Sequence, residues 1–313
     1  MRVINVLLAV GLVCLLGCQE NPRSAAVKVG LLIPAEFSED AGAITEAAGQ
    51  AADEDGRADV VVKVAEPGRI KQAFEELTKP KNKSQAVSAV AVLAVPGLDL
   101  NQAIYGRVMA GVPVVLFNHD LPETNRDFFV PIDDRLAGEL LGRRVLASGE
   151  RKQGIAVVTG QLSSKSQLER LAALQIELQK SPGTTIEKTI RYKDDDQLKR
   201  ELGELPPEIQ AVASTGAWIF HAAVMPELKR FKGKLYAIAN TPEAMQALKS
   251  GQCQVLVVGD LSEQAYRATR LCLSRLRIQT TIEPEPVTPV VLVAQDYWKE
   301  AAASTEPASD KKK

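Results

Sequence analysis

The feature that most constrains the fold is a regular alternation of short apolar runs and amphipathic segments along the 313 residues. The apolar runs are near-continuous, as in parallel strands that are covered on both faces. They span residues 27–35, 58–65, 87–96, 112–118, 127–133, 154–160, 184–192, 209–215, 234–240, 253–260 and 286–296. Between them, residues 68–79, 166–180 and 242–251 repeat apolar side chains at helical period. The alternation predicts an α/β fold with two doubly wound, parallel-sheet lobes.

The charge balance excludes one broad class of partner. The formal net charge is -1, and the only run of three basic residues is Lys311–Lys313 at the end of the chain. Nucleic-acid binding needs clustered Lys and Arg to neutralise phosphates. We therefore expect no nucleic-acid partner. The hydrophobic fraction of 45% is sufficient for sizeable cores.

The N-terminus is typical of a targeting segment. Arg2 precedes an apolar run, residues 3–16, that is too short to span a membrane and fits a signal-peptide core. The sequence "LLGC" (15–18) resembles a bacterial lipobox, although Leu16 departs from the usual small residue. That resemblance implies cleavage before Cys18 and diacylation of its thiol; the alternative is an ordinary secretory signal.

We thus predict a lipoprotein signal peptide at 1–17 and a polar tether at 18–26. The mature protein is expected outside the cytoplasm, lipid-anchored to a bacterial membrane and facing the periplasm or the cell exterior. A lipid chain inserts by burying methylenes at ~0.8 kcal/mol each, so the anchor needs no spanning helix. Gln19 leaves the choice between inner and outer membrane open.

Two cysteines, Cys253 and Cys272, remain after cleavage. Export permits a disulfide between them. The rises of a strand and of the helix that follows it would bring the two to a similar level. They could equally be two buried small side chains. With no CxxC and only two histidines, the sequence predicts no metal site.

One stretch and its flanking motifs carry a resemblance to a known family. "GVPVVLFNHD" (111–120) reads as a strand that ends in polar side chains, and "FVPIDDRLAGELL" (129–141) follows as a short strand and a helix. The segments 27–37, 235–276 and 288–296 agree in the same order. Over roughly residues 27 to 298 the chain resembles the type I periplasmic solute-binding proteins, especially their ribose/galactose-like sugar-binding branch.

The resemblance implies two lobes joined by a three-segment hinge, with a ligand held between them at the carboxyl ends of the strands. The crossings are expected near Asp133, Asp260 and Glu283. The implied N-terminal lobe comprises 27–132 plus 261–283, the C-terminal lobe comprises 133–260 plus 284–298, and 299–313 form a disordered tail.

The same resemblance directs attention to eight candidate ligand-binding residues: Phe37, Asp99, Asn118, His119, Asp133, Trp218, Asn240 and Asp260. Each has a plainer alternative. Asn118 and His119 could only hydrogen-bond their turn, Phe37 could cover the lobe edge, Trp218 could be buried at a helix start, and Asp99 could cap a helix.

Several positions depart from the sugar-binding pattern. Asn118 and His119 stand where the family usually has Asp and Arg, and Thr215-Gly216 replaces a usual Asn-Asp. Leu168 lies near a position that is often a ligand-binding Arg. Arg170 comes two residues later, and the sequence leaves open whether it faces the cleft. The scaffold is kept, but the charged sugar clamp is mostly absent.

The leading functional hypothesis is a monomeric solute-binding protein that captures a small polar, sugar-like ligand for an ABC importer. The alternative is an exported sensor or interaction protein that signals to a membrane partner. An enzyme is not expected, because the G-x-S-x-G, HExxH and GxxxxGK[ST] motifs are all missing. No cofactor is expected either. A DNA-binding repressor is disfavoured because a signal segment occupies the N-terminus.

Overall fold

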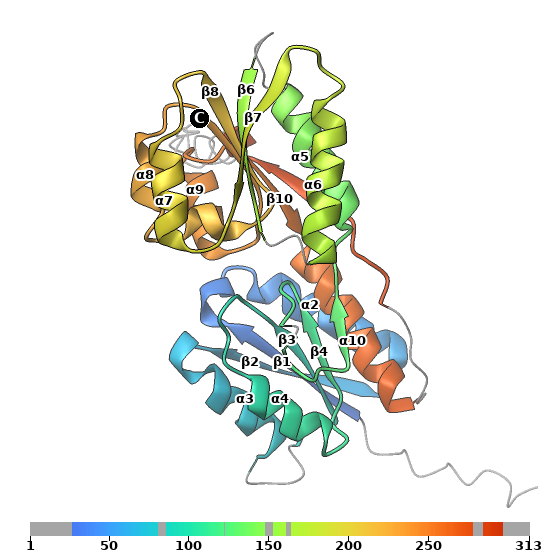
Figure 1. Ribbon diagram of the computed structural model, residues 1–313. Coiled ribbons are helices and arrows are strands. Elements are labelled where there is room, and N and C mark those ends of the chain that lie inside the picture. Colours follow the sequence, from blue (N-terminus) through green and yellow to red (C-terminus); the bar gives the residue numbers. More distant parts are fainter. Residues whose placement is uncertain are drawn as a thin grey trace, which may run out of the picture.

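The computed structural model describes residues 27–80, 86–121, 123–147, 153–160, 164–277 and 284–296. They form two α/β lobes, one above the other in Figure 1. The predicted signal peptide and tether, Cys18, Glu283 and the tail 299–313 lie outside the described residues.

The N-terminal lobe is built on a five-stranded sheet of order β2-β1-β3-β4-β5. Every neighbouring pair of strands is parallel. Short apolar runs rich in branched residues, such as Val90–Val92 and Val114–Leu116, favour strands whose two faces are both buried. The strands are β1 (Val27–Pro34), β2 (Ala58–Ala65), β3 (Ala89–Leu93), β4 (Val114–Phe117) and β5 (Phe128–Val130).

Helices cover both faces of this sheet. On one face, α3 (Ile70–Thr78) and α4 (Asn101–Val108) pack through Ile70, Phe74 and Ile104. On the other face, α2 (Ala41–Asp55) lies beside α10 (Leu261–Arg277). Figure 1 shows the orange α10, late in the sequence, among the blue elements of this lobe. The chain therefore returns to its first lobe near its end.

The C-terminal lobe contains a six-stranded sheet of order β11-β10-β9-β8-β6-β7. Five strands are parallel, whereas β11 runs antiparallel to β10, with Gly259 opposite Pro289. The direction differs because β10 leaves the lobe at the hinge and β11 enters it there. The strands are β6 (Gln153–Thr159), β7 (Thr184–Arg191), β8 (Ile209–Ser214), β9 (Lys234–Ile238), β10 (Val255–Gly259) and β11 (Pro289–Val293).

This sheet is also covered on both faces. The first face packs against α5 (Asp134–Ala147) and α6 (Lys165–Leu178). A Cβ at Gly138 of α5 would lie 2.9 Å from the Cβ of Ala173 of α6, so glycine permits this close contact. The second face packs against α7 (Asp195–Gly203), α8 (Met225–Arg230) and α9 (Pro242–Lys249).

The described parts of the hinge lie side by side. Ile132, after β5, pairs in parallel with Val287, before β11. The main-chain N–H of Asp133 donates to the Val287 carbonyl at 2.9 Å, and that of Val287 donates to the Pro131 carbonyl at 2.8 Å. The second crossing joins β10 directly to α10. The predicted crossings near Asp133 and Asp260 are therefore present.

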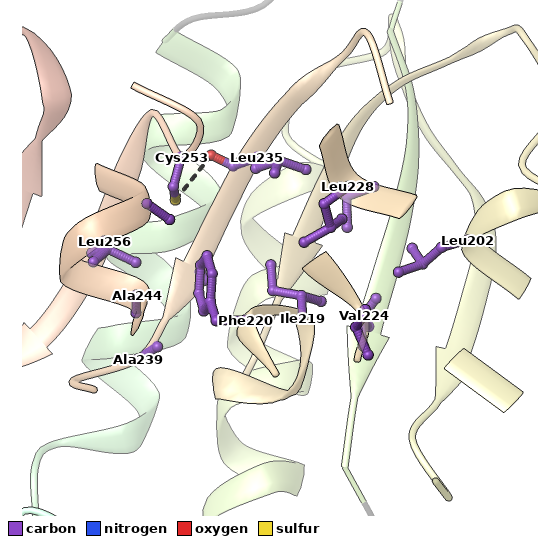
Figure 2. Close-up of a cluster of buried hydrophobic side chains, with 14 of the residues drawn as sticks. Leu202, Ile219, Phe220, Val224, Leu228, Leu235, Ala239, Ala244, Cys253 and Leu256 are labelled. Carbon is purple, nitrogen blue, oxygen red and sulfur yellow. Dashed lines mark hydrogen bonds between the residues drawn. The ribbon is translucent and has the colours of Figure 1, made fainter. Parts of the chain in front are cut away.

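Cys253 and Cys272 do not form the disulfide that was considered. Both thiols are free. Figure 2 shows Cys253 in the core of the C-terminal lobe, where its thiol donates to the Leu235 carbonyl at 3.4 Å. Cys272 is buried in the other lobe, because α10 crosses the hinge instead of returning along its own sheet. Burial raises the pKa of the Cys253 thiol to about 12, which disfavours the reactive thiolate.

Candidate functional site

A cleft between the lobes consists of two adjoining chambers. The hinge-side chamber, of about 830 Å³, is lined by residues that include Asn118, His119, Arg170, Asn240 and Gln264. The outer chamber, of about 540 Å³, is lined by Pro34, Glu36, Pro67, Ile70, Lys71 and 95–99 of one lobe and Ala217, 220–222 and 241–243 of the other. The strands of both sheets end at this cleft, which is where α/β sheets hold ligands.

The N-terminal wall of the hinge-side chamber begins where β4 ends. Asn118 has a φ of 73°, a left-handed conformation that asparagine tolerates better than most residues. Its side-chain NH₂ donates to the Ala94 carbonyl at 3.0 Å, at the end of the neighbouring β3. The turn therefore directs the chain into the cleft. It leaves the side-chain oxygen of Asn118, Oδ1, available as an acceptor.

The next two residues extend this wall. The side chain of His119 lines the chamber with part of its surface exposed, while neighbouring protein atoms surround much of the imidazole. This burial lowers the pKa of the imidazole below its ordinary value of 6.5, although the Asp120 carboxylate acts in the opposite direction. Asp120 pairs with Arg126 at 2.6 Å through one oxygen. The lowered pKa favours the neutral imidazole of His119, and the ion pair with Arg126 balances the charge of Asp120.

The C-terminal wall depends on an ion pair between distant residues. The Nε of Arg170 on α6 donates to Asp134, the first residue of α5, at 2.6 Å, and its Nη1 donates to the Thr215 carbonyl at 3.1 Å. The hydroxyl of Thr215 donates to Gln167 at 2.7 Å. The ion pair is largely buried, with 18% of the Arg170 side chain and 9% of the Asp134 side chain exposed. The guanidinium of Arg170 therefore bonds mainly to groups of its own lobe.

Trp218 follows this network and forms part of the same wall. Its ring stacks on Tyr192, with centroids 5.4 Å apart. A Cβ at Gly160 or at Gly216 would lie 2.6 Å from the indole, so both glycines are needed for the ring to fit. Tyr192 also contacts His221 edge-on. Trp218 is therefore a rigid, partly buried wall of the chamber.

Two carboxamides stand near the second crossing. The Asn240 NH₂ donates to the Gly259 carbonyl at 3.1 Å, and the Gln264 NH₂ donates to the Val130 carbonyl at 3.3 Å. Gln264 is 1% exposed, and its Oε1 accepts no hydrogen bond within the described part of the chain. A Cβ at Gly259 would lie 3.1 Å from this Oε1, so the glycine leaves room for the carboxamide.

The three carboxamides share one arrangement. In each, the NH₂ donates to a main-chain carbonyl, and this bond sets the orientation of the amide. The side-chain oxygens of Asn118 and Asn240 remain as acceptors around the hinge-side chamber, whereas the Gln264 Oε1 is fully buried at its wall. Such a set suits a ligand that is rich in donors, such as hydroxyl groups.

The structure places four of the predicted residues, Asn118, His119, Trp218 and Asn240, on the hinge-side chamber, and Asp99 on the outer chamber. The other three are corrected. Phe37 is 3% exposed and belongs to the core of the N-terminal lobe.

Asp133 and Asp260 are helix caps and line neither chamber. Asp133 accepts from the Leu136 N–H at 2.8 Å at the start of α5, and Asp260 accepts from the Ser262 and Glu263 N–H groups at the start of α10. A carboxylate at these positions satisfies helix donors that would otherwise lack partners.

Sequence reasoning missed several lining residues, chiefly Arg170, Gln167, Gln264 and Asp134. Helical period could have placed Gln167 and Arg170 together on one face of α6. The lining role of Gln264 had no such signal, because it depends on where α10 crosses the hinge. Leu168, near the usual Arg position, is 47% exposed and does not line the chamber.

Other kinds of site find no support in the described residues. Among them, no cluster of three or more His, Cys, Asp or Glu side chains could hold a metal ion. None of the helices in the described ranges is long and apolar enough to cross a membrane.

Comparison with solved structures finds the same two-lobed fold in sugar-binding proteins. A glucose-galactose binding protein, GanP, and an arabinose binding protein, AraP, both from Geobacillus stearothermophilus, match 87% and 88% of this chain and 99% of their own. Their identities are 19% and 16%, with TM-scores of 0.58 and 0.63. A XylFII-LytSN complex matches 87% of this chain and 100% of its own, at 18% identity and a TM-score of 0.52.

A comparison with curated protein sequences gives no match. The family model described as "Periplasmic binding protein domain" matches residues 35–278, which is most of the chain. Such a family consists of binding proteins, so the expectation of a binding protein rather than an enzyme is confirmed. The chain belongs to the periplasmic binding protein family.

Proposed function

We propose that this protein captures a small, polar, sugar-like ligand in the hinge-side chamber and that the two lobes close around it. The observation that carries the proposal is the pair of oriented carboxamide oxygens on Asn118 and Asn240. Hydroxyl groups of a sugar would donate to these acceptors, while Trp218 offers an apolar surface to the ring. Asn118, His119, Trp218 and Asn240 are the proposed contact residues.

The proposal extends to delivery of the ligand to an ABC importer. GanP and AraP are sugar-binding proteins of the same fold, which supports this role. In this proposal the mature chain begins at Cys18, and a lipid on that residue holds the domain at the membrane. Metabolic labelling with a palmitate analogue should mark the wild-type protein and not Cys18→Ser; equal labelling of the two would reject the anchor.

A thermal-shift screen tests the binding step. The mature protein carrying Cys18→Ser would be melted with monosaccharides and polyols. A ligand at 100 times its dissociation constant stabilises the folded state by ~2.7 kcal/mol, which gives a measurable rise in Tm. Asn240→Ala should reduce this rise, whereas Asn101→Ala, at an exposed position on α4, should not. A cooperative transition that no sugar or polyol shifts would reject the proposal.

A sensor role is the second candidate. It is favoured by the likeness to XylFII in its complex with LytSN and by the missing charged clamp. Uptake of the identified ligand in cells with and without the protein separates the two roles. Loss of uptake supports import, and unchanged uptake with loss of a ligand-dependent response supports sensing.

A further inference from the structure

His221 is a cleft residue that the proposed contacts do not include. It directly follows the short 3₁₀ helix η4 (Ala217–Phe220) and lines both the hinge-side and the outer chamber. With 37% of its side chain exposed, part of the imidazole is open to the space between the lobes. The chemistry of its two ring nitrogens therefore bears on what the cleft can bind.

One side of the His221 ring is held by Asp195. The Nδ1 of His221 lies 2.8 Å from the Oδ1 of Asp195, the first residue of α7. An ionised carboxylate only accepts hydrogen bonds, so Nδ1 carries the proton and donates it. The hydroxyl of Tyr192 donates to the same Oδ1 at 3.1 Å. In the neutral ring this tautomer leaves Nε2 as an acceptor.

The bond to Asp195 also orients the ring. Asp195 lines neither chamber, whereas His221 lines both, so the imidazole lies between the carboxylate and the cleft. Because Nδ1 and Nε2 lie on different sides of the ring, a bond from Nδ1 to Asp195 turns Nε2 toward the chambers. Within the described part of the chain, no residue forms a hydrogen bond with Nε2.

Tyr192 supports both His221 and Trp218. Its ring stacks on Trp218, with centroids 5.4 Å apart, and contacts the imidazole edge-on at 5.8 Å. Tyr192 and Trp218 both line the hinge-side chamber. The imidazole is thus fixed by Asp195 and by Tyr192, close to the indole that is proposed to face the sugar ring. An acceptor that is fixed in advance loses little side-chain freedom when a ligand binds.

We propose that His221 is a specificity-determining residue, which accepts a hydrogen bond from a ligand hydroxyl through Nε2, and that Asp195 positions its ring. This inference rests on the proposed sugar-binding function and adds one contact to the C-terminal wall. A ligand without a donor at this point would leave Nε2 unpaired once water is excluded, so the contact selects for a hydroxyl group there.

Two isosteric variants separate a ligand contact from a structural role. In His221→Gln the carboxamide reaches the position of Nε2, whereas in His221→Asn it reaches that of Nδ1 and can keep the bond to Asp195. Calorimetry would first titrate D-glucose, D-galactose, D-xylose and D-arabinose into the mature protein carrying Cys18→Ser. The sugar that binds most tightly would then be titrated into each variant. We expect His221→Asn to weaken binding about fivefold or more, and His221→Gln to weaken it less.

The order of the two variants decides the outcome. A merely structural role predicts the reverse order, because only asparagine keeps the bond to Asp195. Binding by His221→Asn within twofold of the wild-type protein would overturn the contact and leave the proposed function standing. The same conclusion follows if His221→Gln binds no more tightly than His221→Asn. No binding of any of the four sugars to the wild-type protein would reject this contact together with the proposed sugar ligand.

Changes at Asp195 test its positioning role. Asp195→Ala frees the His221 ring and should weaken binding of the same sugar about twofold or more, whereas Asp195→Asn keeps an acceptor for Nδ1 and should restore most of the affinity. In the His221→Asn background, Asp195→Ala should weaken binding no further, because its effect passes through the imidazole. Additive losses would show that Asp195 acts independently of His221 and would overturn this role.

Discussion

The two walls of the hinge-side chamber are built in different ways. The N-terminal wall comes from consecutive residues, Asn118, His119 and Asp120, at the end of one strand. The C-terminal wall brings together Asp134 and Arg170, which are 36 positions apart, and Thr215, 45 positions beyond Arg170. The first wall depends mainly on a local turn, and the second depends on the packing of the whole lobe.

This difference indicates where each wall is vulnerable. A change in the N-terminal turn should alter the cleft with a modest effect on stability, because its contacts are few and partly exposed. A change in the C-terminal network should destabilise the lobe, because its charges are largely buried and paired. The following predictions test this contrast, from the largest expected effect to the smallest.

Arg170→Met should have the largest effect. It leaves the Asp134 carboxylate largely buried without its cation, and breaking a buried pair typically costs ~3–5 kcal/mol. Urea unfolding would show a lower midpoint with little change in slope. Arg135→Met is the control: Arg135 pairs with Glu139 on the surface, with 79% of its side chain exposed, so a change within ~0.5 kcal/mol is expected. Equal losses in the two variants would contradict the contrast.

Gly138→Ala should separate α5 from α6. The new Cβ would overlap the Arg170 carbonyl oxygen and lie close to Ala173, and overpacking of this kind costs ~1–3 kcal/mol. Gly106→Ala on α4 is the matched control, since nothing lies within 4 Å of its Cβ. Alanine in that helix should raise stability by ~0.5–1 kcal/mol. The sign of the change in Tm distinguishes the two, and a stabilised Gly138→Ala would refute the close helix contact.

Asn118→Ala and Asn118→Gly separate the backbone role of Asn118 from its side-chain role. Alanine should lose ~1–2 kcal/mol, because it lacks both the short polar side chain with which asparagine tolerates the left-handed φ of 73° and the hydrogen bond that this side chain makes. Glycine accepts this φ and should lose less, although both variants lose the hydrogen bond to the Ala94 carbonyl. Thermal unfolding gives the comparison. If glycine were as destabilising as alanine, the hydrogen bond rather than the turn would be decisive.

His119→Gln should show the smallest effect, visible as a pH dependence. The folded-state pKa of His119 is lowered, so the unfolded chain binds the proton more readily. The wild-type protein should therefore lose stability relative to the variant as pH falls from above 6.5 down through the lowered pKa. Melting curves at pH 8 and at pH 5 measure this difference. A gap in Tm that does not change between the two pH values would show that His119 does not titrate abnormally.

Much of the fold was predictable because its signals are local. Each predicted apolar run overlaps an observed strand, and residues 68–79, 166–180 and 242–251 overlap α3, α6 and α9, with bounds that differ by a few residues. Periodicity reports burial, and burial on both faces of a sheet leaves a continuous apolar run. The polar cluster at Asn118 was found for the same reason, since it directly follows such a run.

The errors arose where position depends on distant packing. Phe37 was expected at the ligand, but it fills the core beneath α2 and α10. Asp133 and Asp260 were expected in the cleft, yet their carboxylates cap helices. A polar or aromatic residue after a strand has several competing partners, and residue type alone does not decide among them.

The sequence by itself determined the order of strands and helices, their approximate bounds and the cluster of polar residues at the end of β4. These follow from side-chain burial and local backbone preference. The family resemblance already placed residues 261–283 in the N-terminal lobe, where α10 is found. Only the tertiary structure decided that β11 runs antiparallel and that Arg170 and Gln264 line the cleft. The physical reason is that each depends on contacts between segments far apart in the chain, and such contacts leave no periodic signal in the residues that make them.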